Sequence, residues 1–144
     1  MPSIHELDRD QCERLLRSQR LGRISLVTPD GVEVIPVNYA VHEDAVVVRT
    51  SRHGLLARFA HGTHLAFEVD LVDQDRWTGW SVVARGVGEV RDVDPDEVRP
   101  IGASARPWAD GERSRELRIA WRTLTGRRVG HHGSPTTGER SVAR

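Results

Sequence analysis

The chain contains no lysine: all 21 of its basic residues other than histidine are arginine, in a sequence of 144 residues. The absence of lysine excludes a Schiff base on a lysine amine and removes the point charge that commonly binds phosphate. There is one cysteine, Cys12. A single thiol excludes an internal disulfide and a four-cysteine zinc site. Its place in an amphipathic pattern predicts that Cys12 faces the core.

Net charge and long apolar runs are also absent. The 21 basic residues are balanced by 21 acidic ones, so no overall field would attract nucleic acid. No apolar run approaches the roughly 20 residues that a membrane-spanning helix needs, and no signal-peptide pattern opens the sequence. We therefore expect a cytoplasmic protein that binds neither nucleic acid nor membrane.

Common catalytic and metal-binding motifs are missing as well. The sequence has no Walker loop, no serine elbow between glycines and no His-Glu-x-x-His pattern. His61 and His64 straddle the predicted end of a helix, so we do not expect them to share a metal ion. The sequence therefore indicates no metal site and no catalytic residue.

Hydrophobic periodicity predicts a mainly β (α+β) chain with two or three short helices. Glycines inside the strand expected at 79–92 favour a curled sheet, and short connections favour antiparallel pairing, so we expect a small six-stranded barrel. The expected helices are 7–18 and 54–60, with a third beginning at 94–97; the expected strands are 23–28, 32–41, 45–50, 63–70, 79–92 and 117–121. Residues 1–129 would form one domain, and 130–144, poor in apolar residues, a disordered tail.

Arg49, Thr50 and Ser51 follow one another at the end of a predicted strand. A guanidinium offers a flat fork of donors and two hydroxyls add more, so the three side chains suit a phosphate group. The amides that begin the short helix 54–60 could point at the same anion. The alternative is an ordinary strand-end charge followed by an ordinary turn.

Trp80 begins a strand whose alternation places Trp80, Val82 and Ala84 on one face. Ser81 lies on the other face. A tryptophan beside a serine could wall a flat ring and supply a donor, or Trp80 could be a core or interface anchor. Trp77, in a polar loop, is a candidate surface or lid residue.

Six segments together resemble the pyridoxamine 5′-phosphate oxidase-like family, whose members have an FMN-binding split β-barrel. The resemblance spans residues 7–129. The segments are 21–26, 36–39, 47–51, 66–70, 79–82 with Arg85-Gly86, and 124–128. Each segment is weak alone, and their order and spacing carry the assignment.

The resemblance implies a homodimer with two flavin sites, each built from both subunits. The isoalloxazine ring would run along Ile35, Pro36, Val37 and Asn38. The phosphate would be held by Arg49, Thr50 and Ser51. Trp80 and Ser81 would contact the flavin from the neighbouring strand, and Arg127 would reach the cofactor or the partner subunit.

The sequence departs from the family pattern at Leu55. The family commonly places a lysine there, near the phosphate, and this chain has none. Arg52, His53 or Arg58 could replace it. Without a replacement, the phosphate would lose a charge-assisted bond worth roughly 1.5–3 kcal/mol.

The leading hypothesis is an FMN-dependent oxidoreductase that acts on a small aromatic or conjugated molecule. In such an enzyme the cofactor passes hydride or electrons, and the protein positions the ring. A second hypothesis keeps the fold and binds a deazaflavin coenzyme (F-420), whose acidic tail would meet Arg49, Arg52 and Arg58. A third is a binding module that holds flavin or haem without turnover.

Overall fold

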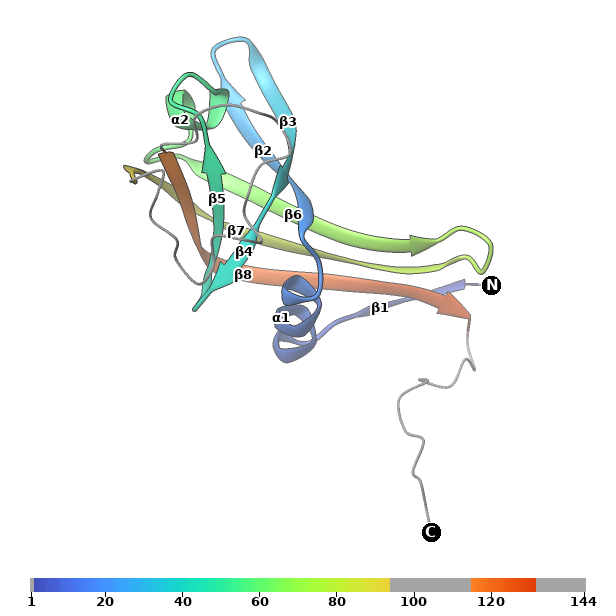
Figure 1. Ribbon diagram of the computed structural model, residues 1–144. Coiled ribbons are helices and arrows are strands. Elements are labelled where there is room, and N and C mark those ends of the chain that lie inside the picture. Colours follow the sequence, from blue (N-terminus) through green and yellow to red (C-terminus); the bar gives the residue numbers. More distant parts are fainter. Residues whose placement is uncertain (1, 94–114, 132–144) are drawn as a thin grey trace.

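The computed structural model describes residues 2–93 and 115–131. These residues form one curled antiparallel sheet with two short helices (Figure 1). The helices are α1 (Arg9–Arg17) and α2 (Leu55–Phe59). The strands are β1 (Pro2–Glu6), β2 (Leu21–Thr28), β3 (Gly31–Asn38), β4 (Ala40–His42), β5 (Ala45–Thr50), β6 (His64–Asp73), β7 (Thr78–Asp92) and β8 (Arg115–His131).

The long strand β8 connects the two parts of the sheet. In the described residues the strand order is β3-β2-β6-β7-β8-β5-β4, and β1 pairs with β8 outside this path. β8 pairs with β5 through residues 115–120 and with β1 through residues 127–131. Its first part therefore belongs to the curled end of the sheet, and its second part runs out with β6, β7 and β1 as a long arm (Figure 1).

The expected fold class is confirmed, but the described residues form eight strands and not six. The strand expected at 32–41 divides at Tyr39, whose amide donates to the carbonyl oxygen of Arg20 at 3.0 Å. β3 consequently stays with β2, while β4 pairs with β5. The extra strand β1 was not expected, because it has no strong pattern of its own and depends on β8 for its hydrogen bonds.

The end of β8 differs from the expected domain boundary. Gly130 and His131, expected to begin a disordered tail, pair with Ser3 and Pro2 in the last rungs of the sheet. The rest of the expected tail, 132–144, and the expected helix start at 94–97 lie outside the described residues.

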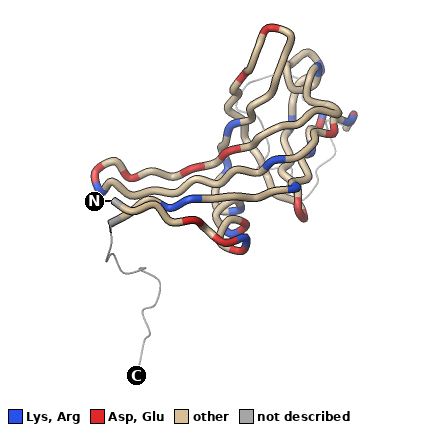
Figure 2. Tube along the Cα trace, turned by 180° about the vertical axis from the view of Figure 1, so that it is seen from behind, with Lys and Arg blue, Asp and Glu red and all other residues tan. Residues whose placement is uncertain are grey.

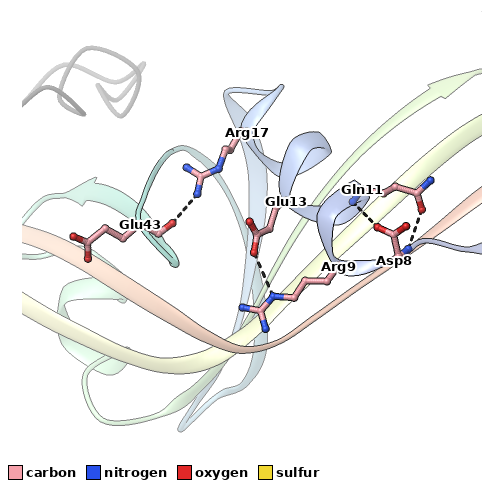
Figure 3. Close-up of polar contacts among 6 residues, drawn as sticks. All are labelled: Asp8, Arg9, Gln11, Glu13, Arg17 and Glu43. Atoms are coloured by element: carbon pink, nitrogen blue, oxygen red, sulfur yellow. Dashed lines mark hydrogen bonds and ion pairs between the residues drawn. The ribbon is translucent and has the colours of Figure 1, made fainter. Parts of the chain in front are cut away.

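Helix α1 packs against the sheet through Cys12 and Leu16, both fully buried. Asp8 caps the helix: its carboxylate accepts from the amide of Gln11 at 2.8 Å, and the Gln11 side chain accepts from the Asp8 amide at 2.9 Å (Figure 3). The predicted core position of Cys12 is confirmed. Burial, with a smaller contribution from Asp8, raises the pKa of the Cys12 thiol.

Tyr39 closes the core beneath this helix. Its ring lies 4.6 Å from that of Phe67, centroid to centroid, and its hydroxyl donates to the carbonyl oxygen of Leu16. The residue is 1% exposed. Burial raises the pKa of the Tyr39 hydroxyl, so the neutral, donating form is the one that fits this core.

Glycines let the sheet curl, as the sequence predicted. The register of β7 against β8 shifts between Arg85 and Gly86, which is the irregularity of a β-bulge. A Cβ on Gly86 would collide with the carbonyl oxygen of Ala120. The bulge therefore requires a residue without a side chain.

Acidic and basic residues are interleaved along the described chain (Figure 2). No helix in the described part of the chain is long and apolar enough to cross a membrane.

Candidate functional site

The structure brings together Trp80, Ser81 and Arg127, three of the residues expected to bind the cofactor. Ser81 on β7 lies opposite Arg127 on β8, and Trp80 lies opposite Arg128. Trp80, Ser81 and Arg127 line a cavity of about 800 Å³ on the long arm. The other lining residues are Ile4, Asp70, Val72, Asp73, Gln74, Asp75, Trp77, Thr78, Gly79 and Val129.

The structure supports the packing interpretation of Trp80, and its contact with a flat ring stays a prediction. Val82 and Ala84, which share its face, are fully buried, whereas Arg85 is exposed, so the predicted alternation is confirmed. Trp80 itself is partly buried and packs against the core cluster. It is therefore both a packing residue and part of the cavity wall.

Arg49 lies on β5, beside the beginning of β8, and has a partner that the sequence did not indicate. It lies opposite Glu116, and its Nε is 3.6 Å from a carboxylate oxygen of Glu116, whose side chain is 2% exposed. Glu116 also accepts two hydrogen bonds from Arg91, at 3.0 and 2.8 Å. The three side chains carry a net charge of about +1, so the cluster still favours an anion.

Glu116 could not be identified from the sequence. It is one acidic residue in a run that alternates with arginines, and such residues usually face solvent. Its role depends on the pairing of β8 with both β5 and β7, which places arginines on either side of it.

Thr50 and Ser51 converge on Gly54, the residue that precedes α2. A Cβ built on Gly54 would lie 3.1 Å from the Thr50 hydroxyl oxygen and 3.3 Å from that of Ser51. The two hydroxyls and the glycine thus form a small polar cradle. The arrangement fits an oxyanion, because hydroxyl donors meet there beside a backbone that has no side chain.

Leu55, half-buried, is the first residue of α2, so no ammonium group stands at the position where the resemblance places lysine. Among the replacements considered, the guanidinium of Arg58 lies 4.9 Å from the centroid of the Phe59 ring. Arg52 and His53 are exposed in the turn that leads to α2. Arg52, whose guanidinium is charged at neutral pH, remains a candidate for the missing lysine.

Residues Ile35 to Asn38 end β3, which lies at the end of the described sheet and pairs there with β2 alone. Val37 is buried, Ile35 is half-buried and Pro36 is exposed. Proline is tolerated on such an edge because it has no amide to donate to a further strand. One edge of β3 is therefore open, among the described strands, to a ligand or to another chain.

The two groups of expected site residues lie far apart within one chain. Arg49 pairs opposite residue 116 of β8, and Ser81 opposite residue 127. Eleven strand residues span about 35 Å along the backbone. β8 bends between them, and the two groups lie toward its opposite ends in sequence.

A family model described as "Pyridoxamine 5'-phosphate oxidase" matches residues 8–128. The chain belongs to this family. The uncharacterized protein Rv0080 of Mycobacterium tuberculosis is 33% identical over 132 residues, which cover 88% of this chain and 86% of that protein.

Two solved structures support the membership in the pyridoxamine 5′-phosphate oxidase family. The FAD binding protein from Mycobacterium smegmatis is 28% identical, with a TM-score of 0.65 over 88% of this chain and 98% of that one. The conserved protein of unknown function DIP1874 from Corynebacterium diphtheriae is also 28% identical, with a TM-score of 0.67 over 86% and 96% of the two chains. The split β-barrel predicted from the sequence is thus confirmed as the fold of this chain.

Proposed function

We propose that the protein is a homodimeric flavin-dependent oxidoreductase that binds FMN and acts on a small conjugated molecule in the cytoplasm. The observation that carries the proposal is the presence of two complementary half-sites toward opposite ends of β8. One half-site offers a cationic cluster and a hydroxyl cradle. The other offers an aromatic-walled cavity with a serine and an arginine.

The first half-site suits the phosphate end of a flavin. The guanidinium of Arg49 would donate to the phosphate, and Thr50 and Ser51 would add neutral donors. Glu116 and Arg91 would keep Arg49 in place. Arg52 would supply part of the charge that a lysine would bring at Leu55.

The second half-site suits the ring. Backbone groups of residues 35–38, on the open edge of β3, would run along the isoalloxazine. Trp80, Ser81 and Arg127 would reach it from the partner subunit, as the resemblance to the family implies. When bound, the flavin would supply the hydride or electron transfer, while the side chains hold and orient the ring.

FAD is the second candidate cofactor. The reason is that the Mycobacterium smegmatis relative, 28% identical, is an FAD binding protein. FMN and FAD share the first phosphate, so Arg49 would serve both. The mass of the flavin released from the purified protein decides between them.

The test begins with the absorbance spectrum and cofactor mass of the purified protein. Flavin bands with the mass of FMN support the proposal. A Soret band would favour haem, and a colourless protein that binds the deazaflavin coenzyme would favour that alternative. A protein that binds none of these would refute a cofactor-binding role.

Arg49→Ala tests the phosphate contact. It should weaken FMN binding about tenfold to a hundredfold, the equivalent of a charge-assisted bond of roughly 1.5–3 kcal/mol. Riboflavin binding should change little, because riboflavin has no phosphate. The control is Arg9→Ala, which removes an exposed arginine that pairs with Glu13 on α1 (Figure 3). An equal loss of FMN and riboflavin would remove Arg49 from the phosphate site.

A further inference from the structure

The turn that joins β6 and β7 holds a tryptophan in an unfavourable backbone conformation. Trp77 has φ of 54°, and among the described residues other than glycine only Glu43, at 52°, shares this left-handed region. A bulky side chain is rare there, because Cβ approaches the backbone carbonyl oxygen. Glycine or asparagine would adopt the same turn at lower cost.

The hairpin fixes this conformation but gains little from the tryptophan itself. The Asp73 carboxylate accepts from the amides of Asp75 and Arg76, both at 3.1 Å, and so shapes the turn without the Trp77 side chain. Trp77 is 73% exposed. The Trp77 side chain therefore gains little burial on folding to offset the free-energy cost of its backbone conformation. A strained and exposed aromatic residue of this kind indicates a binding role.

Trp77 lines the same cavity of about 800 Å³ as Trp80, Ser81 and Arg127. Much of the remaining wall is apolar and comes from Ile4, Val72 and Val129. Two of the cavity's acidic groups already have partners.

These ion pairs offset the charge of two of the three carboxylates that line the cavity, the third being that of Asp75. Asp70 lies 2.8 Å from the guanidinium of Arg23, and Asp73 lies 3.7 Å from that of Arg76. The cavity thus presents the Trp77 indole with a guanidinium and a hydroxyl, and Trp80 borders it. This combination suits a flat conjugated ring with an oxygen-bearing edge.

We propose that Trp77 is a ligand-binding residue that stacks on a flat conjugated ring held in this cavity, with the polar edge of the ring toward Arg127. The proposal rests on the flavin-binding function above and adds to it the outer wall of the ring site. The ring is that of the flavin or that of the conjugated substrate, and the experiment separates the two.

Trp77→Gly and Glu43→Gly form a matched pair. Both replace an exposed residue of positive φ in a hairpin turn by glycine, but Glu43 lies outside the cavity. Its backbone carbonyl, which accepts from Arg17 at 2.8 Å (Figure 3), remains in the variant. Each change should raise Tm by about 3–6 °C through relief of strain.

Binding should separate the two variants. FMN is titrated into flavin-free protein, and 1,4-naphthoquinone into flavin-loaded protein. Trp77→Gly should raise one of the two dissociation constants about three- to tenfold, as expected for a lost aromatic stack. Glu43→Gly should change neither, and Trp77→Phe should recover part of the loss.

A weaker FMN complex would identify the ring as the flavin; an unchanged FMN complex with weaker quinone binding would identify it as the substrate. If wild-type protein binds flavin and Trp77→Gly matches Glu43→Gly in both titrations, the role of Trp77 is refuted and the proposed function stands. Wild-type protein that binds neither compound would refute both.

Discussion

Gly126 allows α1 to approach β8, and adding one methyl group tests this contact. A Cβ on Gly126 would lie 2.8 Å from the Sγ of Cys12 and 3.0 Å from a methyl carbon of Leu7. The first distance is well inside van der Waals contact. Leu7 is flexible and can move, but the buried Cys12 side chain has little room to do so.

Gly126→Ala should therefore lower the free energy of unfolding by about 1–2 kcal/mol, the cost of modest overpacking reduced by the better strand propensity of alanine. Cys12→Ala alone should cost about 1 kcal/mol for the small cavity that it leaves. In the double variant the new methyl group occupies the space of the lost sulfur. We expect Gly126→Ala to cost about 1 kcal/mol less in that background, and the cost that remains to come from the Ser81 carbonyl oxygen, 3.1 Å from the Cβ.

Urea denaturation of the wild type, both single variants and the double variant measures the coupling. The comparison requires that the m-value, the dependence of the unfolding free energy on urea concentration, is the same in all four proteins. Gly130→Ala is the control on the same strand, because a Cβ there meets nothing within 4 Å; its effect should stay within about 0.5 kcal/mol. Additive costs of the two changes would refute the contact between Cys12 and Gly126 as the reason for the glycine.

Two further predictions concern buried polar groups. Because burial raises the pKa of Tyr39 in the folded state, the tyrosine of the unfolded state loses its proton first as pH rises above about 10. The contribution of Tyr39 to the free energy of unfolding is therefore fully present below pH 10 and falls above it. Tyr39→Phe should cost about 1 kcal/mol at pH 7 for the lost hydrogen bond to Leu16 and should flatten the alkaline fall in Tm; the same alkaline slope in both proteins would contradict this assignment. Glu116→Ala should cost about 3 kcal/mol or more, because Arg49 would remain nearly buried without its carboxylate. Arg91→Ala should cost about 2 kcal/mol, because Glu116, 2% exposed, loses the two hydrogen bonds that it accepts from Arg91 but keeps Arg49 nearby. A loss for Arg91→Ala as large as that for Glu116→Ala in urea titrations would contradict the stabilising role of Arg49.

Much of the fold was readable in the sequence because it depends on local patterns. The strand 45–50 was predicted at its observed bounds, and alternation correctly placed Val82 and Ala84 on one face, which the structure buries. Gly86 marked the bulge, since a glycine within a strand usually indicates one. The helical face of Cys12 was equally local.

Other features depended on pairing between distant segments. The run 32–41 is continuous in sequence pattern, yet it divides at Tyr39 because β4 finds a better partner in β5 than in β2. β1 exists only where the long end of β8 offers it a hydrogen-bonding edge. The local sequence of β4 does not indicate β5 as its partner, and that of β1 does not indicate β8.

The candidate site divides in the same way. The sequence alone determined the chemistry available: arginine as the only strong cation, two hydroxyls beside Arg49, and an indole beside Ser81. Tertiary structure alone decided that Glu116 lies against Arg49 and that Trp77 joins Trp80 in one cavity. The physical reason is that side-chain type and periodicity belong to neighbouring residues, whereas strand register brings together residues that the chain itself holds far apart.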